Sequence, residues 1–378
     1  MSLPDDEHTG HSGQKRVAND PGQVAALVQL FQDYACQELI ANLETQLKSV
    51  EIAGNAFPLT VNDGTPTCYI CSPAAAYIDY ALDETRNFGG FPRLQKAICR
   101  LISGLAPLVR ASGLDRQVQL NNWLFSTNPV PDLDRDTVRQ IRSELTQVYP
   151  THAIVLRSLN ELADEASLVA LRQEGFRILP ARQIYLVADA DKAAGLKNMR
   201  ADTNRLKRTH FQYAGNGDFL EEDYPRCARL YEMLYLVKYT PLNPQYTATY
   251  IRRMHEAGLL RLAGLRDSTG KLVAVSGTFL NGRTLTQPIV GYDTSLPKTE
   301  GLYRMVMAMA QAEARRTGAF FNVSAGAADF KRRRGAVPVI EFTAVYIRHL
   351  PLRMRLATAI MEIALRTIGI PLLRKFEL

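Results

Sequence analysis

The chain has 378 residues, of which 46% are hydrophobic and 22% charged, so it is long enough for two domains and can bury a sizeable core. Its five scattered cysteines are an odd number and exclude a disulfide framework. The formal net charge of +7 favours anionic partners such as phosphorylated cofactors, nucleic acid or an acidic membrane surface.

Two local features concern the cellular compartment and the thiols. The first 21 residues are polar and lack an apolar run, so we predict a disordered leader without a signal peptide. No uninterrupted run of about 18 apolar residues suggests a membrane span, and we predict a cytoplasmic protein. Cys68 and Cys71 form a CxxC pair, but no second pair completes a zinc site, so we predict two buried thiols in a strand.

The first half of the chain predicts helices followed by alternating strands and helices. Residues 22–53 have helical spacing of apolar residues, and residues 57–70 suggest a hairpin around Asn62-Asp63-Gly64. Two further helices are predicted at 77–82 and 94–109. The pattern then predicts a strand at 118–126, a helix at 136–148, a strand at 152–158, a helix at 159–174, and short strands at 176–179 and 183–187.

The second half begins with a polar, basic stretch at 191–213 that resembles a connector. Helices are predicted at 223–236, 244–257 and 301–317. Strands are predicted at 260–266, 272–280, 285–292, 320–324 and 340–348, with a basic turn and helix start at 325–335. The tail, residues 351–378, predicts an apolar helix with sparse basic residues.

This order of elements predicts the α/β class, with mixed sheets flanked by helices. Both halves share a trailing pattern of strands and helices, although no repeat is visible in the residues themselves. We therefore predict an N-terminal domain at 22–190 and a C-terminal catalytic domain at 191–350, with a basic connector at 191–208.

Four stretches carry a resemblance to a known family: Leu171–Phe176 leading to Arg182–Tyr185, Met199–Arg208, Val290–Asp293 followed by a long helix, and Ser324–Lys331 followed by Gly335. In this order they resemble the GNAT acyltransferase family, closest to its FemAB-like, double-domain branch. Together they span about half of the chain. The resemblance implies two tandem GNAT-like domains and transfer of an acyl group from a thioester to an amine.

The stretch Lys298–Arg304 resembles the family's donor-binding loop, in which the backbone amides at the start of a helix face an anion. Tyr303 replaces the final small residue of that loop, which puts a coenzyme A donor in doubt. No tightly bound cofactor is implied, and the donor is an acyl-CoA or the phosphopantetheine of an acyl carrier protein. The residues implied for donor binding are Gly291, Lys298, Gly301, Leu302, Tyr303, Arg304 and Lys331.

Four side chains are candidates for the proton transfers. Asp293 and Glu300 lie just beyond a predicted strand, where a carboxylate of raised pKa would accept a proton from an ammonium group. Glu341 interrupts an apolar stretch, so it should be paired or functional. Phe330 stands near the position of the family's tyrosine acid and cannot donate a proton, so Tyr292, Tyr303 or solvent would have to serve as the acid.

The sequence is compatible with several donors and partners. A FemAB-like enzyme would take its donor from aminoacyl-tRNA, with the connector and the Lys331–Arg334 cluster contacting RNA. A catalytically silent binding or membrane-associated scaffold is a third alternative. The tail would lie on the inner membrane, line a groove for a fatty chain, pack on its own domain, or form a homodimer. The histidines lack partners at ligand spacing, so no metal site is predicted.

Overall fold

The computed structural model describes residues 18–88 and 92–376. Its strands are β1 (Gln46–Ile52), β2 (Asn55–Asp63), β3 (Arg116–Leu120), β4 (Ala153–Asn160), β5 (Arg177–Val187), β6 (Gln212–Ala214), β7 (Arg261–Arg266), β8 (Leu272–Asn281), β9 (Thr284–Tyr292), β10 (Phe320–Asn322) and β11 (Val337–Tyr346). Most of the predicted leader lies outside the described residues.

Helices of three kinds surround these strands. The α-helices are α1 (Pro21–Asp33), α2 (Cys36–Leu39), α3 (Ala81–Glu84), α4 (Pro92–Ala111), α5 (Arg135–Val148), α6 (Glu165–Gln173), α7 (Ala190–Ala194), α8 (Lys197–Arg208), α9 (Asp223–Tyr231), α10 (Ala248–Glu256), α11 (Leu302–Thr317), α12 (Ala328–Arg332), α13 (Leu352–Ala364) and α14 (Ile370–Phe376). The π-helical segments are η1 (Ala75–Tyr80), η4 (Glu232–Tyr239) and η6 (Leu365–Gly369), and the 3₁₀ turns are η2 (Thr85–Phe88), η3 (Asn216–Asp218) and η5 (Lys298–Glu300).

The described strands form one 11-stranded sheet in the order β1-β2-β3-β4-β11-β5-β10-β9-β8-β7-β6. The β3–β4 and β9–β10 pairs are parallel and the other neighbours are antiparallel, which confirms the predicted mixed sheet. Strand β11 comes from the second half of the chain but pairs with β4 and β5 of the first half. The two halves therefore share a single continuous sheet.

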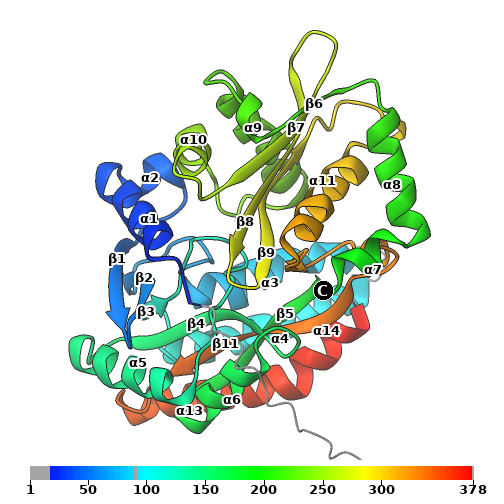
Figure 1. Ribbon diagram of the computed structural model, residues 1–378. Coiled ribbons are helices and arrows are strands. Elements are labelled where there is room, and N and C mark those ends of the chain that lie inside the picture. The colour runs from blue at the N-terminus through cyan, green and yellow to red at the C-terminus, as the bar shows by residue number, and fades with distance from the viewer. Residues whose placement is uncertain (1–17, 89–91, 377–378) are drawn as a thin grey trace, which may run out of the picture.

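Helices cover both faces of the sheet (Figure 1). In the first half, α5 and α6 pack on one face, while η1, α4 and α13 pack on the other. In the second half, α9 and α10 lie on one side of β8 and β9, and α8 and α11 lie on the other. The cores are apolar and well filled, as expected for sheets flanked by helices.

Several predicted elements near the N-terminus were wrong. The helix expected at 22–53 ends at Asp33, and residues 46–52 form β1 because they also alternate along a strand. The hairpin turns at Ala53 and Gly54, whose φ angles of 53° and 71° suit a tight turn, and not at Asn62. Cys68 and Cys71 are buried free thiols as predicted, but they lie in a turn.

Other boundaries also moved for identifiable reasons. The strand expected at 118–126 stops at Leu120 because Asn121 has a φ of 58°, which ends extended backbone. The two strands expected at 176–187 are one strand, β5, interrupted by a bulge at Ala181. The polar connector is helical, since Asp189 caps α7 and Met199 anchors α8. The helix expected from 159 begins at Glu165.

The C-terminal tail is helical as predicted and packs along the first-half strands. Among the described residues, Leu352–Phe376 is long and apolar enough to cross a membrane by length and composition, although the sequence had suggested no such segment. Only 17% of its most apolar window is buried. The tail is therefore unusually exposed for a helix of this composition.

Candidate functional site

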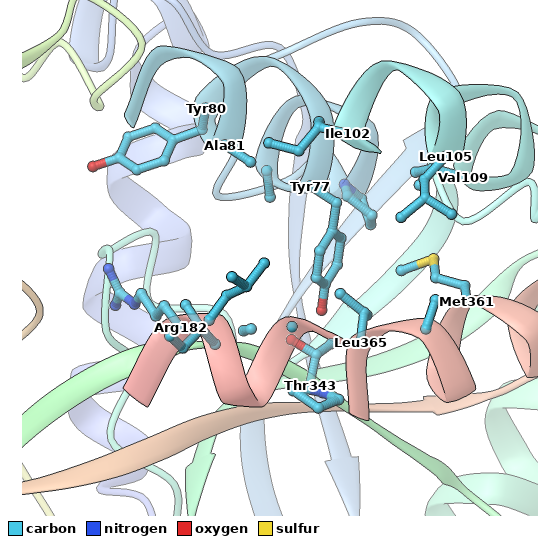
Figure 2. Close-up of a pocket in the computed structure, with 18 of the residues that line it drawn as sticks. Tyr77, Tyr80, Ala81, Ile102, Leu105, Val109, Arg182, Thr343, Met361 and Leu365 are labelled. Atoms are coloured by element: carbon cyan, nitrogen blue, oxygen red, sulfur yellow. The ribbon is translucent and has the colours of Figure 1, made fainter. Parts of the chain in front are cut away.

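The main cavity lies between the tail and the helices of the first half (Figure 2). Its volume is about 240 Å³, far above the ~10–15 Å³ that one water requires. Strands β4, β5 and β11 form the floor, η1, α3 and α4 form one wall, and α13, η6 and α14 form the other. Most lining side chains are aliphatic, including Ile98, Leu101, Ile102, Leu105, Met361 and Leu365. The cavity therefore suits a hydrocarbon chain.

Local backbone features open this space. Both η1 and η6 are π-helical, and single π turns are frequent at functional sites. In β5, Ala181 is the extra residue of a bulge, because Glu341 pairs with Arg182 and Phe342 with Pro180. A bulge redirects neighbouring side chains. It stands where Arg182 and Glu341 border one end of the cavity.

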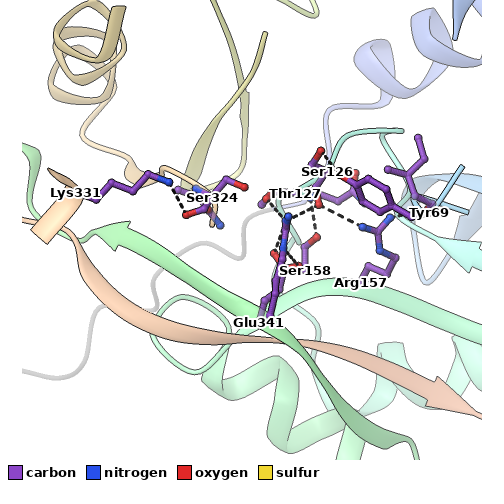
Figure 3. A network of polar contacts seen from close by, with 12 residues as sticks. Tyr69, Ser126, Thr127, Arg157, Ser158, Ser324, Lys331 and Glu341 are labelled. Carbon is purple, nitrogen blue, oxygen red and sulfur yellow. Dashed lines mark hydrogen bonds and ion pairs between the residues drawn. The ribbon is translucent and has the colours of Figure 1, made fainter. Parts of the chain in front are cut away.

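Arg182 is held at the polar end of the cavity by a bidentate ion pair (Figure 3). Its Nε donates to Glu341 Oε1 at 3.0 Å and its Nη2 to Oε2 at 3.3 Å. The Nη2 also donates to the carbonyl of Ser126 at 2.7 Å and to Thr127 Oγ1 at 2.9 Å. Burial would lower the pKa of Arg182, but Glu341 and nearby tyrosines outweigh it, so the pKa is raised.

These contacts engage only the Nε and Nη2 atoms of the Arg182 guanidinium. Its Nη1 makes no hydrogen bond to any residue that the structure describes. Glu341 is buried, with its side chain 3% exposed, whereas Arg182 is half-buried, with its side chain 20% exposed. Buried ion pairs are expensive to desolvate and contribute little net stability, so an oriented donor beside a cavity is a functional feature.

A second arginine and a tyrosine extend the polar end. Arg157 donates from Nη1 to the carbonyl of Ile70 at 2.6 Å and from Nη2 to the carbonyl of Ser126 at 3.3 Å. The Tyr69 hydroxyl lies 2.7 Å from Ser126 Oγ, and burial raises the pKa of Tyr69. These groups border one end of an otherwise apolar space, which defines where a polar head group would lie.

Glu84, at the end of α3, lines the cavity and makes no hydrogen bond within the described part of the chain. Burial raises its pKa to about 7, an effect that Asp83 adds to and Arg182 opposes. A carboxyl with that pKa changes protonation near neutral pH. It is therefore suited to accept a proton from a substrate in this cavity.

Lys331 is buried next to Ser324 and is only 5% exposed (Figure 3). Its Nζ donates to the carbonyls of Ser324 at 3.1 Å and Ala325 at 2.6 Å. Burial and the positive charge of Arg182 lower the pKa of Lys331 to about 7. Glu341, predicted to be paired or functional, and Lys331, predicted to bind the donor, thus both lie beside Arg182.

The predicted donor loop lies elsewhere, at the start of α11. Gly301 has a φ of 68°, and Arg205 from α8 lies over it, so a Cβ at Gly301 would meet Arg205 Cδ at 2.9 Å. Arg205 Nη1 donates to the carbonyls of Thr299 at 2.8 Å and Glu300 at 3.1 Å. The helix entrance that we expected to face an open groove is therefore covered by an arginine side chain.

The other donor-loop residues have mixed environments. Lys298 is exposed, Leu302 is buried in the core of the second half, and Arg304 Nε bonds Asp202 at 2.5 Å. Tyr303 stands between Tyr292 and Phe330, with ring centres 6.1 and 4.9 Å away. An aromatic ring therefore occupies the position where the family has a small residue.

Strand β9 has an open edge near its C-terminal end. Strand β10 pairs with β9 only from Thr284 to Thr286, so the rest of β9 up to Tyr292 has no strand partner on that side among the described residues. Gly291 packs against the backbone of Leu230, because a Cβ there would lie 2.5 Å from the Leu230 carbonyl carbon. Its small size thus serves contact with α9 and not the approach of a ligand.

Asp293 does not have the raised pKa expected of a base. It accepts from Arg226 Nη2 at 2.6 Å and from Ser295 Oγ at 2.5 Å. Burial alone would raise the pKa of Asp293, but these bonds outweigh it and the pKa is lowered. Tyr292 accepts a hydrogen bond from Lys238, and Glu300 lies partly exposed in η5.

Sequence reasoning missed Glu84, Arg157 and Arg182 as site residues. The two arginines interrupt apolar strands, just as Glu341 does, so the same argument would have found them. Glu84 has no such signal, because it lies in a helical stretch of mixed polarity. Within the described residues, no group of three or more His, Cys, Asp or Glu side chains is arranged to hold a metal ion.

Comparison with known proteins identifies the fold. Residues 193–332 match the family model of the acetyltransferase (GNAT) domain. The C-terminal domain (DUF2156) of a protein described as a lysylphosphatidylglycerol synthetase, from Agrobacterium fabrum, is similar to 91% of this chain and 95% of its own, with 11% identity and a TM-score of 0.51. L-PGS from Bacillus licheniformis has 12% identity and a TM-score of 0.50, covering 93% of this chain and 99% of its own.

A third structure, FemX, has 11% identity and a TM-score of 0.46, covering 60% of this chain and 81% of its own. No match to the sequence of a curated protein reaches significance. Residues 193–332 thus carry a GNAT-type acetyltransferase domain, as predicted, and the chain has the predicted α/β class with a mixed sheet flanked by helices. The division at residue 190 stays a prediction.

Proposed function

We propose that the protein is an N-acyltransferase for a long acyl chain, which lies in the cavity between α4 and α13 while its carbonyl group meets Arg182. The apolar cavity that ends at the buried Arg182–Glu341 pair carries this proposal. Moving a hydrocarbon chain out of water is favourable by roughly 25 cal/mol per Å² of apolar surface. A chain of several carbons would therefore gain affinity from these walls.

In the proposed reaction an amine nitrogen attacks the carbonyl carbon of an acyl thioester. The C–N bond forms, the C–S bond breaks, and the thiolate leaves with the electron pair and then takes up a proton. Arg182 Nη1, which is free to donate, would stabilise the negative charge that develops on the carbonyl oxygen. Glu341 acts as a positioning residue, since it holds the guanidinium in place.

Glu84 is the proton acceptor in this proposal, because it lines the same cavity and its pKa of about 7 lets it exist as the carboxylate at neutral pH. Lys331 is proposed to act indirectly, because its Nζ donates to the carbonyls of Ser324 and Ala325 and holds the turn after β10. Tyr292, Asp293 and Glu300 lie beside the open edge of β9 and are proposed as outer contacts of the donor and not as the base.

The donor would be an acyl-CoA or an acyl carrier protein, and the acceptor a small amine such as an amino acid or a biosynthetic intermediate. The carrier of the acyl group, which is CoA or the carrier protein, would approach along the open edge of β9. The contacts proposed for the carrier are Lys298, Tyr303 and Arg304, to which the structure adds Arg205. The proposed setting is the cytoplasm.

A second candidate is transfer of an aminoacyl group from tRNA to an amphiphile whose chain lies in the same cavity. The exposed basic face of α8, which includes Lys197, Arg200, Lys207 and Arg208, favours it. A protein of similar fold is described as a lysylphosphatidylglycerol synthetase. In this second candidate the amphiphile is the acceptor and aminoacyl-tRNA is the donor. Binding of tRNA that weakens steeply with salt concentration would support it.

Thermal stabilisation by acyl thioesters tests the first candidate. Palmitoyl-CoA should raise the melting temperature by several degrees, whereas acetyl-CoA should have little effect, because only the long chain fills the cavity. Ala364→Phe places a ring in the cavity and should abolish the response to palmitoyl-CoA. Ala312→Phe, on the exposed face of α11, is the matched control and should respond like the wild type.

An equal response to both thioesters, or an unchanged response in Ala364→Phe, would contradict the role of the cavity.

Measurement of turnover distinguishes an enzyme from a catalytically silent scaffold. With palmitoyl-CoA and a panel of amino acids, Glu84→Gln should lower kcat by about tenfold to a thousandfold and leave the stabilisation by palmitoyl-CoA unchanged. Binding of the thioester without release of CoA to any acceptor would favour the scaffold or the tRNA-dependent candidate.

A further inference from the structure

Helix α13 carries an apolar stripe on its exposed face. Leu352, Leu356, Ile360 and Ile363 are 63%, 54%, 53% and 61% exposed. Their spacing of four, four and three residues places them along one side of the helix. Single exposed apolar residues are common on protein surfaces, but a continuous row of them usually marks a contact surface.

The opposite face of the same helix belongs to the protein core. Ala357, Thr358 and Met361 are buried, and Met361 also lines the cavity. The helix is therefore held in place on one side while its second apolar side faces outward. Further along the tail, Ile368 both lines the cavity and is 40% exposed. The outer surface and the apolar cavity thus meet at this side chain.

Positive charge borders the stripe. At 3.6 residues per turn, Arg353 and Arg355 fall on opposite sides of the stripe, and both are exposed. Arg374 and Lys375 follow at the end of the tail. The single acid of the described tail, Glu362, is already paired with Arg177 at 2.8 Å and Arg366 at 3.3 Å. The surface therefore offers an apolar row between cations.

We propose that this face of α13 lies on an anionic lipid bilayer, with the apolar stripe inserted at the level of the acyl chains and the arginines at the level of the head groups. An amphipathic helix with cations beside its apolar face binds a bilayer in this way. A second copy of the chain is a poorer partner, because its α13 offers Arg353 and Arg355 no free acid: Glu362 is already paired with Arg177 and Arg366. The inference deepens the proposed function, since a chain would reach the cavity from the bilayer past Ile368.

Vesicle flotation tests this surface. The full chain should float with vesicles of phosphatidylcholine mixed with phosphatidylglycerol, and much less with vesicles of phosphatidylcholine alone. The double variant Leu356→Glu/Ile360→Glu should bind the anionic vesicles at least tenfold more weakly, because carboxylates then replace the inserted side chains. Arg353→Gln/Arg355→Gln should lose roughly tenfold in binding to the anionic vesicles.

The matched control is Val237→Glu, which changes a side chain that is 71% exposed on η4, away from the tail. It should float like the wild type. Absence of flotation with anionic vesicles, or equal flotation of the Leu356→Glu/Ile360→Glu variant, would overturn the inference. So would a dimer of the wild type that this variant converts to a monomer, because the stripe would then be a subunit contact.

Failure of this inference is distinguishable from failure of the proposed function. Stabilisation by palmitoyl-CoA below its micelle concentration needs no bilayer, so the Leu356→Glu/Ile360→Glu variant should retain it. A protein that responds to palmitoyl-CoA but ignores vesicles keeps the proposed function and loses the membrane surface. A protein that floats but responds to no long-chain thioester keeps the surface and loses the proposed donor.

Discussion

At the residue scale, charged side chains inside apolar segments mark the site. Glu341 could be recognised from the sequence because it interrupts an apolar run, and the structure pairs it with Arg182. Which cation it would meet was not predictable, because the partner lies 159 residues away in the chain and the pairing depends on the register of β11 with β5. Lys331 was predicted as a donor contact, yet its burial depends on the same packing.

Lys331 should make stability depend on pH. Its pKa in the folded state, about 7, is below the ordinary lysine value of 10.5, so between these values the unfolded state binds more protons and stability rises with pH. We expect the wild type to gain on the order of 1–3 kcal/mol in free energy of unfolding relative to Lys331→Met between about pH 7 and pH 9. Urea unfolding at several pH values measures this gain.

Lys207, exposed on α8, supplies the control. Lys207→Met should follow the wild type across the same pH range, because the exposed amine of Lys207 is in water in both the folded and the unfolded state. A parallel dependence on pH in the wild type and Lys331→Met would mean that the buried amine is not displaced from its ordinary pKa.

At the element scale, the start of α11 combines a left-handed glycine with a covering arginine. The pattern of apolar residues located the start of this helix to within a residue, since the sequence predicted 301–317 and α11 spans Leu302–Thr317. The resemblance placed Arg205 in a basic connector but did not predict that its side chain lies over the start of α11. Elements whose residues fit both the strand and the helix period, such as 46–52, were likewise assigned wrongly.

Gly301→Ala should lower the free energy of unfolding by about 1–2 kcal/mol, because a Cβ is strained at a φ of 68°. Gly318 ends the same helix at a φ of 64° but has open space around its missing Cβ. Gly318→Ala therefore measures the backbone cost alone and should be the milder change. In an Arg205→Ala background, Gly301→Ala and Gly318→Ala should lower the free energy of unfolding by equal amounts. A double-mutant cycle measured by urea unfolding checks this.

At the scale of the whole molecule, the shared sheet ties the two halves together. The sequence suggested two sheets because alternation reports strands and not their partners, so the pairing of β11 with β4 and β5 had no local signal. The α/β class and the order of elements in the second half were predictable, since each strand and helix there has clear turns at its ends.

Calorimetry of the full chain tests how strongly the halves depend on each other. We expect a single transition whose calorimetric and van't Hoff enthalpies agree, because each half has a gap in its part of the sheet that a strand of the other half fills. Separately expressed fragments 22–190 and 191–350 should not give cooperative transitions. Two resolved transitions in the full chain, or a stably folded fragment, would show that the predicted domain boundary is also a thermodynamic one.

The place of β11 also has a consequence for synthesis on the ribosome. The strands that flank it, β4 and β5, emerge more than a hundred residues earlier. In the nascent first half, the position between β4 and β5 therefore stays empty until β11 has been synthesised. Unpaired strand edges readily capture other chains. A premature stop codon anywhere before residue 337 would leave that gap permanently, and such truncated products should be cleared by chaperones and proteases or accumulate as aggregates.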